Sequence, residues 1–270
     1  MGGEEFLAGE VLGYGAYLCL RVEDVEAARR EGAGRIAALA ARLGLRNEFE
    51  AAAVPLSRES FALITRRGAT AADIADSPVQ DAAAMIHVSS ARAETVDELS
   101  GEVSRVMSGA GHVKAYRGQS RPKNYTSAAM DKWAYARQVA QQPGPAMPNA
   151  FFVPLSKTAD WWKKGWMERH TYFLPRYDDE GRMLNEGHAL ATEAGIACLL
   201  RRTYRHAVSP APAGEYDFLT YFECADEAVP IFHQVCAALR DVKRNPEWRF
   251  VREGPTWQGR RVPTWEALFA

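Results

Sequence analysis

The stretch from residue 196 to residue 224 reads IACLLRRTYRHAVSPAPAGEYDFLTYFEC and contains two apolar runs. Residues 196–206 and 216–224 are rich in aliphatic, β-branched and aromatic side chains, which favours strands. The segment between them is rich in proline, glycine and other turn-forming residues. The stretch therefore predicts two consecutive strands that can pair as an antiparallel hairpin.

The segments on either side of this hairpin have the pattern of helices and further strands. Residues 180–195 and 226–242 show helical spacing, and strands are expected near 149–156 and 247–252. The chain order is then β-α-β-β-α-β, which is the order of a ferredoxin-like unit, in which two helices cover one face of an antiparallel sheet.

The N-terminal part of the chain repeats this order. The elements expected there are strands at 59–67, 82–89, 12–21 and 111–118, and helices at 23–43 and 93–107. Corresponding elements of the two parts are displaced by about 135 residues, although the parts share almost no residue identity. We therefore predict an α+β fold in which two tandem ferredoxin-like units form a dimeric α+β barrel within one chain. The uncovered sheet faces would meet in the middle, where a flat apolar cofactor could lie.

The pattern divides the chain into two halves and a connector. We expect an N-terminal half at 1–118 without a cofactor, a connector at 119–148, and a C-terminal half at 149–270 that carries the functional site. The connector contains GQSRPKNY and QQPGPAMP, which lack periodicity, and residues 163–181 are similarly irregular. Most of the histidines and tryptophans lie in the C-terminal half.

The composition argues against two classes of protein, those that bind nucleic acids and those that span membranes. The chain has 270 residues, of which 47% are hydrophobic and 25% charged, with a formal net charge of −1. This balance argues against nucleic-acid binding, and no apolar run approaches the roughly 20 residues of a membrane helix. None of the four cysteines forms a CxxC pair, which favours buried reduced thiols. With no signal peptide visible at the N-terminus, we expect a cytoplasmic protein.

Arg201 is unusual because its neighbours on the same strand face are small or apolar. If it were buried there, it would need an anionic partner, since an unpaired buried charge is costly. Alternation alone favours the simpler interpretation that the strand emerges into solvent at this point. If the two strands pair, Thr220 and Phe222 would lie close to Arg201, and the three could steer and polarise a small anion or peroxide.

His188 is a lone histidine on an expected helix. A single neutral imidazole can serve as a haem ligand, whereas zinc needs three or four ligands and the sequence has no HExxH motif. There is also no GxGxxG motif, P-loop or nucleophile elbow. By itself a lone helical histidine is more often structural or exposed, so these patterns leave the site open.

Several short motifs between about residues 119 and 259 occur in the order of one known family. They are SRPKNY, VPLSKTADWW, a helix containing EGH, LLRRTYRH, FLTYFE, DVKRN and GPTWQG. Arg201 also follows His188 by thirteen residues, as in that family. Together these features resemble the chlorite dismutases, haem b enzymes related to the coproheme decarboxylases. The N-terminal half contributes only a compatible pattern.

The resemblance implies a haem b cofactor and roles for particular residues. His188 resembles the proximal iron ligand, and Arg201 resembles the distal catalytic arginine. The positions that resemble haem-contacting ones are Lys157, Trp161, Trp162, Tyr125, Thr203, Thr220 and Phe222. The implied reaction converts chlorite to chloride and O2, with the arginine holding hypochlorite until it recombines. The resemblance also implies a small-molecule substrate and a homo-oligomer, often a pentamer.

The sequence departs from the family at four places, one of which is a hairpin after His206 that is longer by roughly four residues. Arg244, in DVKRN, stands where a glutamate usually accepts a hydrogen bond from the proximal imidazole, and Thr203 replaces the usual leucine. About a dozen extra residues also lie around 167–180. These departures favour two alternatives. One is a haem enzyme of the same fold that acts on a small organic substrate, through an N–O bond or peroxidase-like chemistry. The other is a non-catalytic haem-binding protein.

The extra residues introduce a second candidate ligand, His170. We prefer His188 because only His188 lies on a helix that is followed by the arginine-bearing strand at the family's spacing. Val153 stands where the coproheme decarboxylases have a tyrosine, and an aliphatic side chain cannot form the tyrosyl radical that their reaction needs. The decarboxylase activity is therefore disfavoured.

Overall fold

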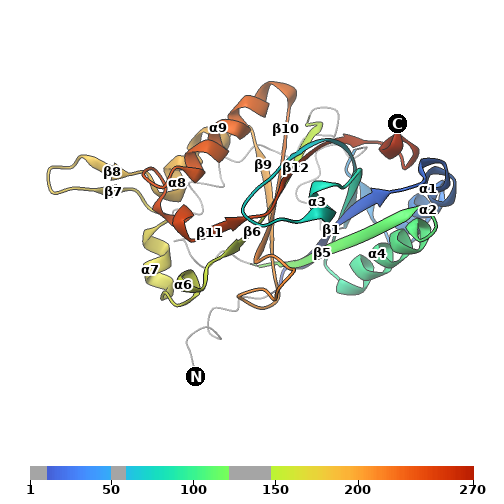
Figure 1. The fold of residues 1–270 in the computed structure, drawn as a ribbon, viewed down its shortest axis with the longest axis horizontal. Helices are drawn as coiled ribbons and strands as arrows, with labels where there is room; N and C mark the ends of the chain where they lie inside the picture. The colour runs from blue at the N-terminus through green and yellow to red at the C-terminus, as the bar shows by residue number, and fades with distance from the viewer. Residues whose placement is uncertain (1–10, 50–58, 122–146) are drawn as a thin grey trace.

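The computed structural model of the protein describes residues 11–49, 59–121 and 147–270 (Figure 1). Tyr125 and most of the expected connector lie outside these ranges. Among the described residues, no helix combines the length and the apolar character that crossing a membrane requires.

The N-terminal half has four long strands, which are covered on one face by helices. Its elements are β1 (Gly13–Val22), α1 (Val25–Gly32), α2 (Arg35–Arg42), β2 (Arg46–Asn47), β3 (Ser60–Thr70), α3 (Ser77–Gln80), β4 (Ala84–Ser90), α4 (Ala93–Met107) and β5 (Gly111–Ser120). The single helix expected at 23–43 is wrong, because the chain forms α1 and α2 there instead. Gly34 lies between them with φ at +71°, a left-handed conformation that interrupts a right-handed helix.

The C-terminal half contains more short elements than the sequence predicts. They are β6 (Asn149–Lys157), α6 (Ala159–Trp162), α7 (Trp166–Thr171), β7 (Arg176–Tyr177), β8 (Met183–Asn185), α8 (Gly187–Ala191), η2 (Glu193–Gly195), β9 (Leu200–Arg205), β10 (Phe218–Cys224), η3 (Asp226–Ala228), α9 (Val229–Arg240), η4 (Pro246–Phe250), β11 (Val251–Glu253), β12 (Thr256–Val262) and η5 (Glu266–Phe269). The helix expected at 180–195 is mostly wrong, because the β7–β8 hairpin takes its first part and only α8 is α-helical. The strand expected at 247–252 begins late, because Pro246 cannot donate a ladder hydrogen bond and instead starts the 3-10 helix η4.

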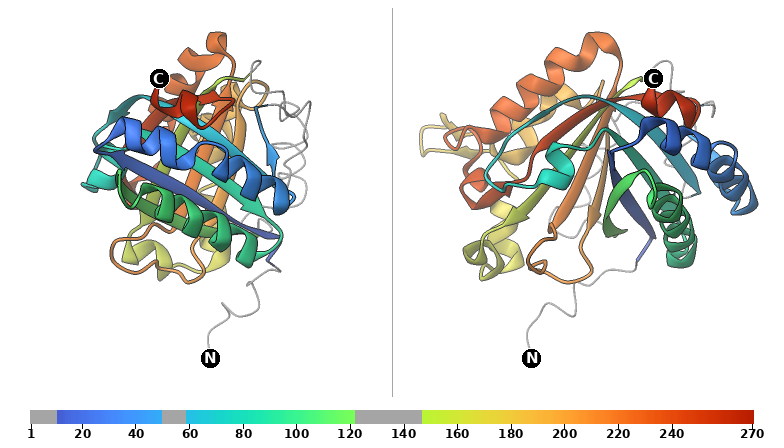
Figure 2. Two further views of the ribbon diagram at one scale, coloured as in Figure 1. Left: turned by 90° about the vertical axis from the view of Figure 1, so that its right-hand side faces the viewer. Right: turned by 45° about the vertical axis from the view of Figure 1, so that its right-hand side comes forward.

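Eight strands close into a barrel, as the α+β barrel prediction requires. They follow the order β10-β9-β5-β1-β4-β3-β12-β6, and β6 pairs again with β10. The two halves meet where β12 pairs with β3 and where β5 touches β9 at Gln119 and Arg205. The main helices lie outside the strands, with α9 on one side and α1, α2 and α4 on the other (Figure 2).

The inside of the barrel is packed with side chains, which corrects one expectation. Aromatic residues fill it, among them Tyr17, Phe152, Tyr221 and Trp257, each at most 1% exposed. The middle of the barrel, where the sheet faces meet, is therefore not the place for a flat cofactor. Arg202 also points inward and is buried beside Glu48, rather than lying at the surface.

Candidate functional site

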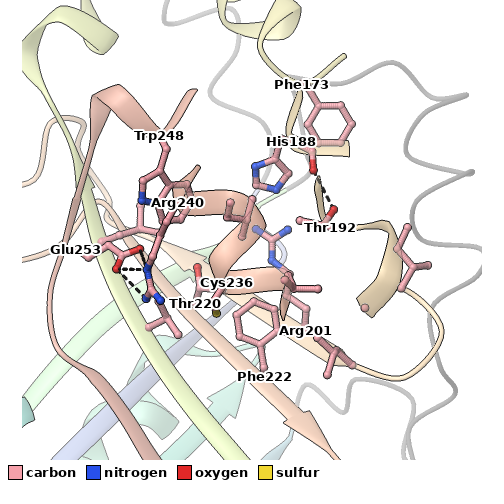
Figure 3. A pocket seen from close by; sticks show the side chains of 17 residues that line it. Phe173, His188, Thr192, Arg201, Thr220, Phe222, Cys236, Arg240, Trp248 and Glu253 are labelled. Atoms are coloured by element: carbon pink, nitrogen blue, oxygen red, sulfur yellow. Dashed lines mark hydrogen bonds and ion pairs between the residues drawn. The ribbon is translucent and has the colours of Figure 1, made fainter. Parts of the chain in front are cut away.

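The outer face of the C-terminal sheet, the segment around α8 and helix α9 enclose a cavity with an open mouth (Figure 3). It contains about 900 Å³ of space, including the mouth. The strands β6, β9 and β10 contribute Val153, Leu155, Arg201, Thr220 and Phe222 to its lining. The helical side and the rim contribute Phe173, His188, Thr192, Gly195, Ile196, Leu199, Val235, Cys236, Leu239, Arg240, Trp248 and Glu253. Most of the lining is apolar, so the few polar groups dominate its chemistry.

Arg201 reaches this cavity because the side chains of β9 alternate between the two faces of the sheet. Leu200, Arg202 and Tyr204 are buried, while Arg201 and Thr203 are half-buried on the outer face. β9 pairs with β10 so that Arg201 lies opposite Phe222, as the hairpin predicts. The Nε atom of Arg201 donates a hydrogen bond to Thr203 Oγ1 at 3.2 Å. The sheet wall thus presents a guanidinium beside an aromatic ring.

His188 lies across the cavity on α8, and its imidazole is held by a carboxylate. Its Nδ1 is 3.1 Å from Glu247 Oε2, and Glu247 Oε1 accepts a hydrogen bond from Lys157 Nζ at 2.5 Å. Burial would raise the pKa of the Glu247 carboxyl, but the Lys157 ammonium and the His188 hydrogen bond outweigh it and hold that pKa well below its ordinary value. An ionised carboxylate only accepts hydrogen bonds, so Nδ1 is the donor. The Nε2 lone pair is left for the cavity.

The inference that the chain has Arg244 in place of the glutamate that accepts from the imidazole is wrong, because Glu247 is that acceptor. Arg244 instead forms an ion pair with Glu186, with two contacts of 2.8 Å, at the start of α8. The turn at Asn245 and Pro246 brings the carboxylate to the imidazole three residues later than expected. A count of residues from the VK in DVKRN does not allow for this turn. The acidic residue that follows Pro246 is the only sign of it in the sequence.

The extra residues near 167–180 provide part of the support for His188. The backbone N–H groups of His188 and Ala189 donate to the carbonyls of Tyr172 and Phe173, at 3.1 and 3.0 Å. The Phe173 ring stacks on the imidazole, with centroids 5.5 Å apart and planes 17° apart. Sequence reasoning assigned Phe173 no role, because only the fold shows that this segment returns to α8.

Lys157 and the two tryptophans lie behind the imidazole rather than in the cavity wall. Lys157 Nζ is 4.3 Å from the centroid of Trp161, whose ring is buried. Trp162 stacks on Phe218, with centroids 6.3 Å apart. Lys157 therefore acts on the cavity through Glu247, and Trp161 packs against it.

The remaining candidates are placed as follows. His170 lies on α7 and does not line the cavity. At the far rim, Arg240 Nε contacts both carboxylate oxygens of Glu253, at 2.9 and 3.1 Å. Burial raises the pKa of the Cys236 thiol to about 11, so it remains protonated and is a poor metal ligand. Among the described residues, no three His, Cys, Asp or Glu side chains come together as a metal site, which leaves His188 as the candidate single ligand.

The whole chain is similar to solved structures of one kind. A chlorite dismutase from Candidatus Nitrospira defluvii in complex with imidazole is 19% identical, with a TM-score of 0.64 over 99% of this chain and 98% of that one. A mutant of that enzyme in complex with cyanide is 20% identical, with a TM-score of 0.64 over 100% and 98%. No family model matches the sequence, and no curated protein matches it. At this identity the likeness establishes the fold: the chain has the chlorite dismutase fold.

Proposed function

We propose that this protein is a haem b-dependent oxidoreductase that converts chlorite to chloride and O2. One observation carries the proposal: a half-buried imidazole with an ionised acceptor faces an arginine-bearing sheet across an apolar cavity. The fold supports it, because structures with the same fold are chlorite dismutases.

The residues of the cavity fit a haem. Haem iron commonly takes one neutral imidazole, and the hydrogen bond to Glu247 selects the tautomer of His188 whose Nε2 can donate its lone pair. The same hydrogen bond strengthens the imidazole as a donor. Apolar residues, among them Val153, Leu155 and Leu199, suit the face of a porphyrin. When bound, haem would supply an iron centre that exchanges oxygen atoms with chlorite.

Arg201 provides the positive charge that attracts the anionic substrate. A guanidinium is permanently cationic and planar, so it can hold an oxyanion through two donors. Its Nε donates to Thr203 Oγ1 at 3.2 Å, and the side chain lines the cavity. The lining is mostly apolar, which lowers the local dielectric constant and strengthens this attraction. In this proposal Arg201 would hold the chlorine oxyanion in the cavity during turnover.

A second candidate function keeps the haem but changes the substrate to a small organic compound, through an N–O bond or peroxidase-like chemistry. One argument for it was Arg244, and that argument falls because Glu247 supplies the acceptor. The hydroxyl of Thr203 beside Arg201 still makes the sheet wall more polar than a leucine would. This candidate predicts a spectral change with organic N–O compounds and none with chlorite.

The test combines haem binding with oxygen production. We expect the purified protein to develop a Soret band on titration with haem, and the band to be lost in His188→Ala but kept in the matched control His170→Ala. An oxygen electrode should then record an O2 burst when chlorite is added. Haem-loaded protein that gives no burst contradicts the chlorite reaction, and protein that stays colourless contradicts every haem-based function. We also propose a homo-oligomer, which light scattering in solution tests.

A further inference from the structure

The inner side of the cavity wall packs against a cluster of oxidisable side chains inside the barrel, which come from β1, β4 and the wall strand β10. Inside the barrel, Tyr17, His87 and Tyr221 pack against one another. The ring centroids of His87 are 4.9 Å from Tyr17 and 5.7 Å from Tyr221, and those of the two tyrosines are 5.5 Å apart. All three side chains are at most 1% exposed. A side-chain oxidation here would be shielded from solvent.

Tyr221 is the member of this cluster closest in the chain to the cavity. It lies on β10 between Thr220 and Phe222, which both line the cavity on the opposite face. Successive side chains of a strand point to opposite faces, so a single layer of backbone separates the Tyr221 ring from the cavity.

Tyr221 also has a partner that can take its proton. Its hydroxyl donates a hydrogen bond to Glu223 Oε1 at 2.8 Å, within the range for direct proton transfer. Glu223 is completely buried, and its other oxygen, Oε2, is 2.8 Å from Arg261 Nη1. Burial raises the pKa of the Glu223 carboxyl although Arg261 opposes it, which favours uptake of a proton.

Packing alone does not explain these groups. A phenylalanine would fill the position of Tyr221 with nearly the same volume, and burial of a hydroxyl and a carboxylate costs free energy even when they are hydrogen-bonded. Glu223 also neutralises Arg261, so the feature that packing leaves unexplained is the Tyr221 hydroxyl with the hydrogen bond that it donates to Glu223.

We propose that Tyr221 is a redox-active tyrosine, with Glu223 as its proton acceptor, that removes an oxidising equivalent left on the cavity site by a peroxide. The inference rests on the proposed haem function. The peroxide would take two electrons from the haem-loaded site as its O–O bond breaks, and Tyr221 then gives one electron back, so that one of the two oxidising equivalents remains at the site. The O–H bond of Tyr221 breaks, its proton moves to the Glu223 carboxylate, and a neutral phenoxyl radical remains. The step protects the site from damage when substrate is absent.

Electron paramagnetic resonance tests this proposal. Haem-loaded protein is mixed with one equivalent of hydrogen peroxide, frozen within seconds and examined for a tyrosyl signal. We expect the signal in the wild type, with a yield per haem at least several-fold lower in Tyr221→Phe and in Glu223→Gln. Tyr177→Phe, an exposed tyrosine on the β7–β8 hairpin, is the matched control and should keep the signal.

The outcomes separate this inference from the proposed function. A Soret band together with peroxide consumption but no tyrosyl signal overturns the role of Tyr221 and leaves the haem function intact. An unchanged signal in Tyr221→Phe overturns it equally. If that variant fails to fold, Glu223→Gln decides the question, since loss of the proton acceptor should lower the yield while the phenol remains. Wild-type protein that forms no Soret band overturns both proposals.

Discussion

The Glu247 carboxylate contacts a cation and an imidazole at once, and these contacts decide how it titrates. Its pKa is lowered in the folded protein, chiefly because Lys157 and His188 outweigh its burial. It therefore contributes stability that is fully present above the ordinary carboxyl pKa of about 4.3 and is lost as the pH falls towards the lowered value. We expect the free energy of unfolding of the wild type to decrease with acid in this window, and that of Glu247→Gln to change less. Urea titrations at several pH values measure both.

The same variant should also be less stable at neutral pH. Lys157 is 6% exposed, and it forms an ion pair with Glu247. Removal of one member of a buried pair costs on the order of 3 kcal/mol, because the remaining charge loses its compensation. Lys157→Met combined with Glu247→Gln should recover part of this loss. A double variant no more stable than Glu247→Gln would show that the pair is not coupled.

Thr203 is a positioning residue for the Arg201 side chain. Its hydroxyl accepts from the guanidinium Nε at 3.2 Å. Thr203→Val keeps the shape and removes this hydrogen bond, which should weaken binding of small anions by about 1 kcal/mol, or roughly fivefold. Thr203→Ser keeps the hydroxyl and should bind like the wild type. Spectral titration of the haem-loaded protein with azide measures the difference, and equal affinity in Thr203→Val would exclude this role.

At the scale of elements, long segments with a clear period were predictable and short ones were not. The helix expected at 93–107 is confirmed as α4, because its apolar residues recur at helical spacing over four turns. The helix expected at 180–195 failed because Gly181 and Gly187 adopt positive φ and break it. The arginine strand and its partner were predictable from alternation. Glu247 was not, because the turn at Asn245 and Pro246 decides which carboxylate reaches the imidazole.

Gly187 makes the start of α8 sensitive to substitution. Its φ is +61°, and a Cβ atom there would lie 2.4 Å from the Leu174 carbonyl oxygen. Gly181 has a similar φ of +80° with open space around it. We expect Gly181→Ala to cost about 1 kcal/mol from backbone strain alone. Gly187→Ala should cost clearly more and weaken haem binding, because α8 carries His188. Chemical denaturation and haem titration of the two variants check this, and equal losses would contradict a clash at Leu174.

At the scale of the whole molecule, buried charges join the two halves of the barrel. Glu48 comes from the N-terminal half, and Arg202 and Arg261 from the C-terminal half, where Arg202 Nη1 hydrogen-bonds to Glu48 Oε1 and Arg261 Nη1 lies 3.8 Å from Glu48 Oε2. Burial would raise the pKa of the Glu48 carboxyl, but Arg202 and His87 outweigh it and hold that pKa well below its ordinary value. The ion pair thus stays charged among the buried aromatic rings of the core. Because this ion pair joins residues of both halves, we infer that it constrains how the two halves pack against each other.

This interpretation predicts strong coupling between the two charges. Arg202→Met leaves Glu48 buried without its principal cation and should lower the free energy of unfolding by on the order of 3 kcal/mol. Addition of Glu48→Gln should restore a large part of that loss, because no uncompensated charge then remains. Arg244→Met, which breaks a more exposed pair, is the control and should change stability by less than about 1 kcal/mol. Urea unfolding followed by both tryptophan fluorescence and circular dichroism measures these values. Additive losses in the double variant would show that the halves are held by their apolar core and strand pairing instead.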